Sequence, residues 1–406
     1  MRIRRRQAFT LVELMVAMAL IIFIMAILSE AFVVGMKTFR DLKAVGDMDQ
    51  NLRTITVNIR GDLSSDHFEG RRRLSDPTFW AQGIPREGFF RALQMTPVQA
   101  TVPVGGIAAP GYYDEGPDGD GNHSFVATDH RLHFTVKRRG NQKDRFFSAS
   151  IPAASPLLIY TNFDSELGTG DGRMQDPSGT TYNSQWAEVG YFLLPTTDGA
   201  GGPGPIGTPL FALYRVELAI TPDNSKINWP STPLIPGAPV NGANLPAYAG
   251  LSCNVDSTSG NLYFNNPSDL TTTTPINRRT FDPVNILRQG QPAFTAQNAN
   301  LLPATLLMTD VISFHVQMIF AWDKAISQGP GVQEVLTQEN QVFGTFRDFN
   351  SFDTGTPLPV QAPPPPPDPL RPADTNPPRV VGIKISIRVW DAKTQQARQI
   401  TVVQDM

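Results

Sequence analysis

The stretch from Met1 to Glu30 reads MRIRRRQAFTLVELMVAMALIIFIMAILSE and decides how the rest of the chain is organised. Four arginines lie among its first six residues, and an apolar run follows from Phe9 to Leu28 that only Thr10 and Glu13 interrupt. A helix of this length rises by about 1.5 Å per residue and covers about 30 Å, the thickness of a membrane's hydrocarbon layer. We therefore expect one membrane-spanning helix, and the arginines predict that the N-terminal head stays in the cytoplasm while the rest crosses.

Two ordinary interpretations of this stretch compete. A secretory signal has a shorter apolar core of roughly 7–15 residues before a small-residue cleavage site, whereas Ser29 to Phe32 continue a helical pattern here. A plain signal anchor does not explain Glu13, because a carboxylate at the centre of a membrane helix costs roughly 2.5–3.5 kcal/mol, and the position of Glu13 nearer the end of the run softens this penalty without removing it. A charged residue inside such a run is therefore a candidate for a specific function.

The octapeptide from Gln7 to Leu14, QAFTLVEL, resembles the prepilin cleavage and methylation signature of type IV pilins and type II secretion pseudopilins. The resemblance implies that prepilin peptidase cuts between Ala8 and Phe9, and that the new amine of Phe9 is methylated. It also implies an assembly role for Glu13, the fifth residue of the processed chain. A carboxylate buried among apolar helices needs a cation, which the Phe9 amine of a neighbouring subunit would supply. Ala8 departs from the glycine that usually precedes the cut in this family.

Beyond the membrane run, apolar side chains recur at steps of three and four, which is typical of one face of an amphipathic helix. They are Phe32, Met36, Phe39, Leu42, Val45, Met48, Leu52, Ile55, Ile59 and Leu63. Proline is absent from Met1 to Ser75, so we expect one helix from Phe9 to about Leu63. Residues 9–28 of this helix would lie in the membrane, and residues 29–63 would lay the apolar stripe on a globular domain. The second half of the helix also resembles that of J-type minor pseudopilins.

From about Ser64 the pattern changes to the alternation of half-buried strands. Predicted strands are residues 132–136, Trp186–Leu194, Leu210–Ile220, Val311–Phe320, 381–389 and 400–403. The last two would form a C-terminal hairpin within residues 379–406. A helix packed on a mainly antiparallel sheet is an α+β fold, and the family resemblance implies the same.

Glycine, proline and polar residues dominate the long connections between these strands. We expect residues 195–209 and 221–280 to be irregular, since their composition lacks the alternation of strands. The proline-rich run 356–378 predicts a stiff linker between the globular domain, residues 64–355, and the hairpin.

Composition limits the remaining functions. The chain has 406 residues and a net charge of −3, so no nucleic-acid partner is expected. Removing residues 1–8, with four arginines and no acid, would take the net charge from −3 to −7. The single cysteine, Cys253, excludes an intrachain disulfide, and we expect it to be a small buried residue.

Few residues of the chain form patterns typical of a metal or catalytic site. Residues Asp118 to Asn122 place oxygen ligands at alternating positions, as in a calcium loop, but His123 stands where the sharp turn needs glycine. His130 and His133 are three apart, a poor spacing for one metal on a strand. We therefore expect no catalytic residues, no metal site, no cofactor and no enzymatic activity.

These observations favour a minor pseudopilin of a type II secretion system, held in the bacterial inner membrane by one helix with its C-terminal domain in the periplasm. Expected partners are prepilin peptidase, other pseudopilins or pilins, inner-membrane lipid and secreted protein substrates. Two alternatives stay open: a minor pilin of a type IV pilus, and a membrane-anchored extracytoplasmic binding protein or hydrolase that uses a prepilin leader.

Overall fold

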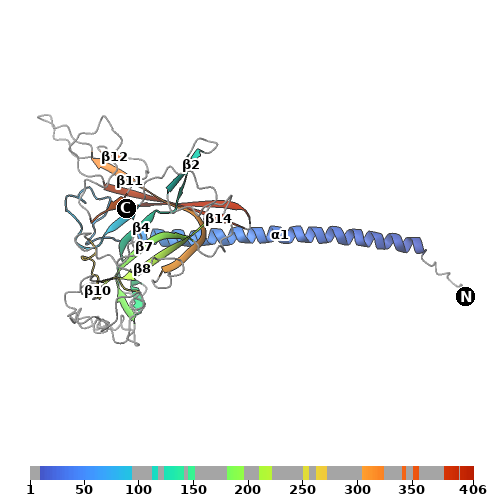
Figure 1. The fold of residues 1–406 in the computed structure, drawn as a ribbon, viewed down its shortest axis with the longest axis horizontal. Helices are drawn as coiled ribbons and strands as arrows, with labels where there is room; N and C mark the ends of the chain where they lie inside the picture. The colour runs from blue at the N-terminus through green and yellow to red at the C-terminus, as the bar shows by residue number, and fades with distance from the viewer. Residues whose placement is uncertain are drawn as a thin grey trace.

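The computed structural model has one long helix that projects from a β-sheet domain (Figure 1). The residues that it describes are 10–93, 112–117, 123–140, 145–150, 181–195, 210–221, 250–255, 262–271, 304–323, 341–343, 351–355, 379–392 and 394–406.

The helix α1 runs from Leu11 to Leu63, which confirms the predicted single helix and its end. Its 53 residues correspond to a length of about 80 Å at 1.5 Å per residue. The helix ends at a serine pair, where the Ser64 N–H donates to the Arg60 carbonyl at 2.9 Å and the Ser65 hydroxyl donates to the Gly61 carbonyl at 2.8 Å. Side-chain and backbone donors thus satisfy carbonyls that the last turn leaves without a helical partner.

The described strands follow α1 in the order β1 (Phe90–Leu93), β2 (Tyr112–Pro117), β3 (His123–Ala127), β4 (Arg131–Lys137), β5 (Phe147–Ser150), β6 (Thr181–Ser184), β7 (Trp186–Pro195), β8 (Phe211–Ala219), β9 (Cys253–Val255), β10 (Leu262–Phe264), β11 (Ala304–Asp323), β12 (Gln341–Phe343), β13 (Ser351–Asp353), β14 (Arg379–Asp391) and β15 (Gln396–Asp405).

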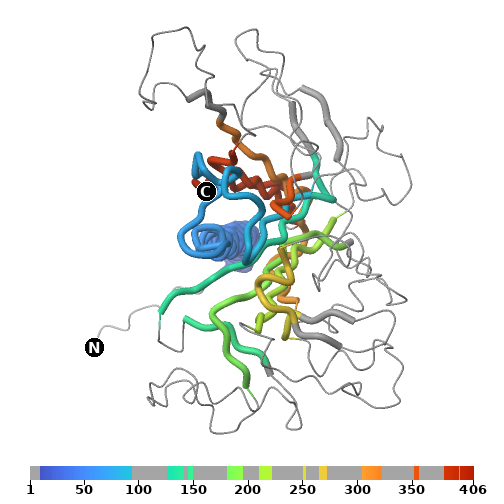
Figure 2. The backbone as a smooth tube through the Cα atoms, turned by 90° about the vertical axis from the view of Figure 1, so that its left-hand side faces the viewer, coloured from blue at the N-terminus to red at the C-terminus, as the bar shows by residue number. Residues whose placement is uncertain are grey.

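One nine-stranded sheet dominates the described part of the domain, in the order β13-β1-β4-β7-β8-β11-β14-β15 with β12 beside β11. The described strand pairs of this sheet are antiparallel, so the predicted α+β fold is confirmed. Three further two-stranded ladders pair β2 with β3, β5 with β6, and β9 with β10. Seen along the helix, α1 lies against the sheet beside the strands of the C-terminal hairpin (Figure 2).

All six predicted strand segments are strands, as parts of β4, β7, β8, β11, β14 and β15. The expectation that residues 221–280 would be irregular is wrong for β9 and β10, two three-residue strands that pair with each other. These strands are too short to produce a periodic pattern, so their pairing depends on tertiary contacts. The proline-rich run 356–378 lies outside the described residues.

The core forms where α1 crosses the inner face of the sheet. Five apolar residues of the helix stripe are buried there: Met48, Leu52, Ile55, Ile59 and Leu63. They belong to the same apolar cluster as buried residues of β4, β7, β11 and β14. Fully burying an aliphatic or aromatic side chain stabilises the fold by about 1.5–3 kcal/mol, so this contact is the main attachment of the helix.

The segment between α1 and β1 adds a second layer of packing although it has no regular structure. Phe68 and Phe79 are almost fully buried and meet edge to face with ring centroids 5.2 Å apart. Arg72 covers Phe79, with its guanidinium carbon 4.4 Å from the ring centroid, and bonds Glu69 at 3.1 Å. These contacts close the end of the core beyond the helix.

Candidate functional site

The start of α1 contains the residue to which the sequence assigns an assembly role. Thr10 is the N-cap, and the Glu13 backbone N–H donates to its hydroxyl at 3.4 Å. In return, Oε2 of Glu13 accepts from the Thr10 backbone N–H and from the Thr10 hydroxyl, both at 3.0 Å. This reciprocal arrangement is a capping box, which satisfies backbone donors that a helix start leaves open.

The capping role of Glu13 was missed from the sequence, although the signal was present as the spacing Thr10-Leu11-Val12-Glu13. Among the described residues, both contacts of the carboxylate use Oε2, so Oε1 remains for another donor. The capping contacts therefore still allow Oε1 of Glu13 to accept from an amine, as predicted for assembly. The predicted processing site, Ala8 and Phe9, lies outside the described residues.

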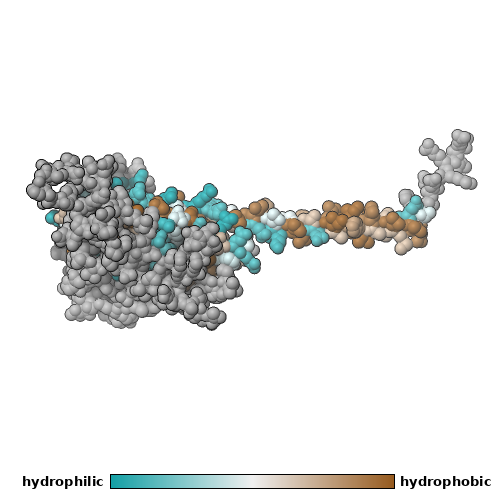
Figure 3. Space-filling view, turned by 90° about the horizontal axis from the view of Figure 1, so that it is seen from above, coloured by the Kyte–Doolittle hydropathy of each residue, from teal (hydrophilic) through white to brown (hydrophobic). Residues whose placement is uncertain are grey.

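The first half of α1 is bare of protein contacts in the described chain. It is the one described helix long and apolar enough to cross a membrane, and none of its most apolar window is buried. Figure 3 shows this half as a continuous hydrophobic surface that gives way to polar side chains near the domain. A lipid-facing role is consistent with such exposure, because water would not solvate this surface favourably.

The prediction that residues 29–63 of α1 lay their whole apolar stripe on the globular domain is wrong for the middle of the helix. Burial begins at Met48, whereas Phe32, Phe39 and Leu42 are 69%, 68% and 65% exposed, and Met36 is 41% exposed. The periodicity indicates an apolar face, but it does not specify what covers that face. In this chain the sheet covers only its C-terminal part, so residues 32–42 are an apolar surface outside the globular domain.

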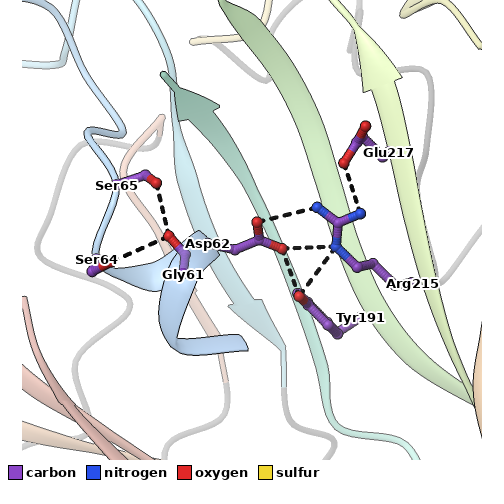
Figure 4. Close-up of polar contacts among 7 residues, drawn as sticks. All are labelled: Gly61, Asp62, Ser64, Ser65, Tyr191, Arg215 and Glu217. Atoms are coloured by element: carbon purple, nitrogen blue, oxygen red, sulfur yellow. Dashed lines mark hydrogen bonds and ion pairs between the residues drawn. The ribbon is translucent and has the colours of Figure 1, made fainter. Parts of the chain in front are cut away.

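A buried ion pair attaches the last turn of α1 to the sheet (Figure 4). Asp62 accepts from Arg215 of β8 in a bidentate pair, with Nε to Oδ2 at 2.8 Å and Nη2 to Oδ1 at 3.1 Å. The Tyr191 hydroxyl on β7 donates to the same carboxylate at 2.6 Å, and Glu217 lies 2.7 Å from the other side of the Arg215 guanidinium. One carboxylate of the helix thus joins two neighbouring strands, β7 and β8.

The electrostatics of this cluster favour the charged pair. Burial alone lowers the pKa of Arg215, but the hydrogen bonds and negative charge of Asp62 raise it overall. Burial raises the pKa of the Tyr191 hydroxyl well above its usual value, and the neighbouring Asp62 charge raises it further. Tyr191 therefore stays a neutral donor and Arg215 stays a cation at any physiological pH.

His67 makes a second link between the end of α1 and the sheet. Its Nδ1 lies 2.7 Å from the Thr135 carbonyl oxygen on β4, and its Nε2 lies 3.2 Å from the Leu63 carbonyl oxygen on α1. Burial lowers the pKa of His67, against the opposing effects of these two carbonyls and of the Asp62 and Asp66 charges. Burial thus favours the neutral ring, whose single N–H can donate to only one of these two carbonyl oxygens at a time.

A third link lies nearer the membrane end of the domain. Arg398 of β15 donates to Asp49 of α1 at 2.9 Å. Their side chains are 33% and 46% exposed, so solvent weakens this pair relative to that of Asp62. Polar links to β15, β8 and β4 therefore hold the domain end of the helix at separate points of the sheet.

His130, the residue before β4, and His133 of β4 belong to no group of three or more metal-ligating side chains within the described residues. His130 and His133 are both fully buried. His133 Nε2 lies 2.7 Å from Oε1 of Glu188, and Oε2 of the same carboxylate accepts from the Ser252 hydroxyl at 2.6 Å. A nucleophilic serine would instead hydrogen-bond the imidazole that activates it. No group of three or more metal-ligating side chains occurs in the described part of the chain. The calcium-like loop, residues 118–122, lies outside that part, as does the side chain of Cys253.

Comparison with known proteins identifies the N-terminus. A family model described as the prokaryotic N-terminal methylation motif matches residues 3–29. No curated protein and no solved structure matches the chain. The match covers the leader and most of the apolar run, so it supports a prepilin-type protein on the segment that carries Ala8, Phe9 and Glu13.

This class has direct consequences for the chain. The motif implies processing by prepilin peptidase and assembly with other pilins. Together with the bare apolar helix, it is consistent with membrane anchoring.

Proposed function

We propose that this chain is a minor pseudopilin of a type II secretion system, most like the J-type, and that it acts by assembly rather than catalysis. The observation that carries the proposal is the methylation motif at residues 3–29 on a helix whose first half is entirely exposed. In this role the helix leaves the inner membrane as part of a filament, while the domain faces the periplasm and supports protein export.

The proposed mechanism begins with cleavage between Ala8 and Phe9, which creates a new amine at the membrane surface. Glu13 keeps its capping contacts with Thr10 through Oε2, and Oε1 binds the Phe9 amine of the neighbouring subunit. A buried carboxylate without a cation is costly, so only the axial register that pairs the two charges is stable.

The exposed stripe of residues 32–42 supports the same proposal. Phe32, Phe39 and Leu42 are too exposed for a helix that stays alone in water, and they lie beyond the membrane-length run. In a filament they would pack against the equivalent helices of neighbouring subunits. The rigid links at Asp62, His67 and Asp49 would transmit the position of the helix to the domain.

The first test is mass spectrometry of the intact N-terminus of membrane-extracted protein. The proposal expects a chain that begins at Phe9 and carries one added methyl group. A chain that begins at Met1, or one cut beyond Leu28, would refute prepilin processing. Deletion of the gene then separates the systems, because a pseudopilin mutant loses secretion, whereas a type IV pilin mutant loses adhesion or twitching.

A further inference from the structure

The two ends of the nine-stranded sheet differ in a way that the proposed function does not explain. One edge is β13, a strand of only three residues, Ser351–Asp353. The other edge is β15, a strand of ten residues, which pairs with β14 over ten consecutive positions without a bulge. Proteins usually protect long edges with bulges, prolines or inward charges, because an open edge accepts another strand.

The outward hydrogen-bonding groups of β15 can be assigned from its register. Met406 donates its backbone N–H to the Val381 carbonyl at 3.0 Å, in line with the pairing of Asp405 with Gly382. Residues alternate along an antiparallel strand, so even-numbered residues bond to β14 and odd-numbered residues point their N–H and C=O away from it. Gln399, Thr401 and Val403 therefore present backbone donors and acceptors at the edge.

Side chains along this edge do not block an incoming strand. The sequence of β15, QARQITVVQD, contains no proline and no lysine, and its one arginine, Arg398, is paired with Asp49. Gln399, Thr401 and Val403 are all exposed, and the described chain pairs β15 with β14 alone. Among the described residues, the edge thus lacks the usual protection against strand addition.

A groove lies beside this edge, between β15 and α1. It has a volume of about 330 Å³ and is lined by Asp49, Leu52, Arg53, Arg398, Gln399 and Ile400. Ile400 is half-buried and faces the helix, so a strand paired with β15 would place an adjacent side chain over the groove. The floor is apolar at Leu52 and Ile400, and Arg53 adds a positive charge at the rim.

We propose that β15 is a strand-addition site for an extended segment of a different protein, with an apolar residue that enters the groove and an acidic residue near Arg53. Main-chain hydrogen bonds would supply the affinity and the groove the specificity, as in other β-augmentation sites. This occupant is neither a filament helix nor a lipid, since both lack free strand-like backbone groups.

The geometry disfavours antiparallel pairing with the β15 strand of a second copy of this chain. β14 lies along α1 in Figure 1, and β15 is antiparallel to β14, so β15 is also collinear with the helix. Antiparallel pairing of two β15 strands would point the two α1 helices in opposite directions. Both helices start in the same membrane, a step that rests on the proposed function, so that arrangement is excluded.

Peptide binding to the full chain in detergent tests this inference without any need for processing or filament assembly. The probe is a fluorescent eight-residue peptide of alternating valine and threonine with one central glutamate; the control peptide has the same sequence with methylated backbone nitrogens. We expect saturable binding of the probe, and binding about tenfold or more weaker for the methylated peptide, because it cannot donate its backbone hydrogen bonds.

Proline variants of β15 locate the binding on the protein. Thr401→Pro removes one outward N–H and leaves the bonds to β14, so it should weaken binding about tenfold or more, whereas Thr401→Val should bind normally. Val403→Pro serves the same purpose if Thr401→Pro does not fold by circular dichroism. Absence of saturable binding, or equal binding by the proline variants, would overturn the proposal. Dimerisation of the protein that the probe competes away would assign the edge to a second copy instead and also overturn it.

Discussion

Replacing Asp62 with asparagine should destabilise the attachment of α1 to the sheet. The change removes one negative charge and keeps the shape of the side chain, so Tyr191 can still donate to the remaining amide oxygen. Arg215, whose side chain is only 15% exposed, loses its bidentate partner. Breaking a fully buried pair costs about 3–5 kcal/mol. Because Glu217 remains 2.7 Å from Arg215, we expect a loss of about 2–3 kcal/mol in the free energy of unfolding.

The assay is denaturant unfolding of the full chain in detergent, followed by tryptophan fluorescence. Asp49→Asn is the matched control, since it makes the same chemical change on the same helix in a pair whose side chains are 33% and 46% exposed. That variant should lose less than about 1 kcal/mol. The denaturant dependence should stay the same in both, because neither change alters the surface exposed on unfolding.

A double-mutant cycle separates the pair from the rest of the cluster. Asp62→Asn combined with Arg215→Met should cost at least about 1 kcal/mol less than the sum of the single changes, since the second change removes the uncompensated cation. If Asp62→Asn costs no more than Asp49→Asn, the pair does not hold the helix and the reasoning is refuted.

Three further predictions concern the helix and the segment between it and β1. Glu13→Gln should leave cleavage intact, as measured by mass spectrometry, and should reduce incorporation into filaments, since an amide cannot neutralise the amine of a neighbour. Normal incorporation of this variant would contradict the assembly role of Glu13. Glu13→Asp tests whether a negative charge alone suffices. Gly88→Ala should lower the unfolding midpoint, because Gly88 has a φ of +79° and a Cβ there would lie 2.1 Å from the His67 carbonyl oxygen. Gly35→Ala is the control: open space surrounds Gly35, so this change should not lower the midpoint. Burial lowers the pKa of His67, so its ring should titrate below the ordinary pKa of 6.5 in histidine NMR spectra, with the signal assigned by His67→Gln. The contribution of His67 to the free energy of unfolding is therefore complete above pH 6.5 and declines as the pH falls. Titration above 6.5 would mean that the effect of the two carbonyls outweighs that of burial.

The predictable part of the site is local in sequence. The leader, the apolar run and Glu13 are recognised from neighbouring residues, and the same holds for α1 and the strands of the C-terminal hairpin, whose periodic patterns are long. The capping contact of Glu13 with Thr10 is also encoded locally, as a three-residue spacing, but it was recognised only in the structure.

The links between helix and sheet could not be predicted in this way. Asp62 lies 129 residues from Tyr191 and 153 residues from Arg215, and no motif connects them. His67 likewise meets a carbonyl of β4, 68 residues away. Each of these contacts exists because sheet order brings β4, β7 and β8 beneath the helix end.

By itself, the sequence determined that this chain has a prepilin-type N-terminal motif, one long apolar helix and an antiparallel sheet, because such motifs and periodic burial are encoded in consecutive residues. Only the tertiary structure decided where the helix stripe is covered, which charges hold it, and which sheet edge stays open. The reason is that periodicity specifies that a face is apolar, whereas the partner of that face, and the pairing of buried charges, depend on residues that only the folded topology brings together.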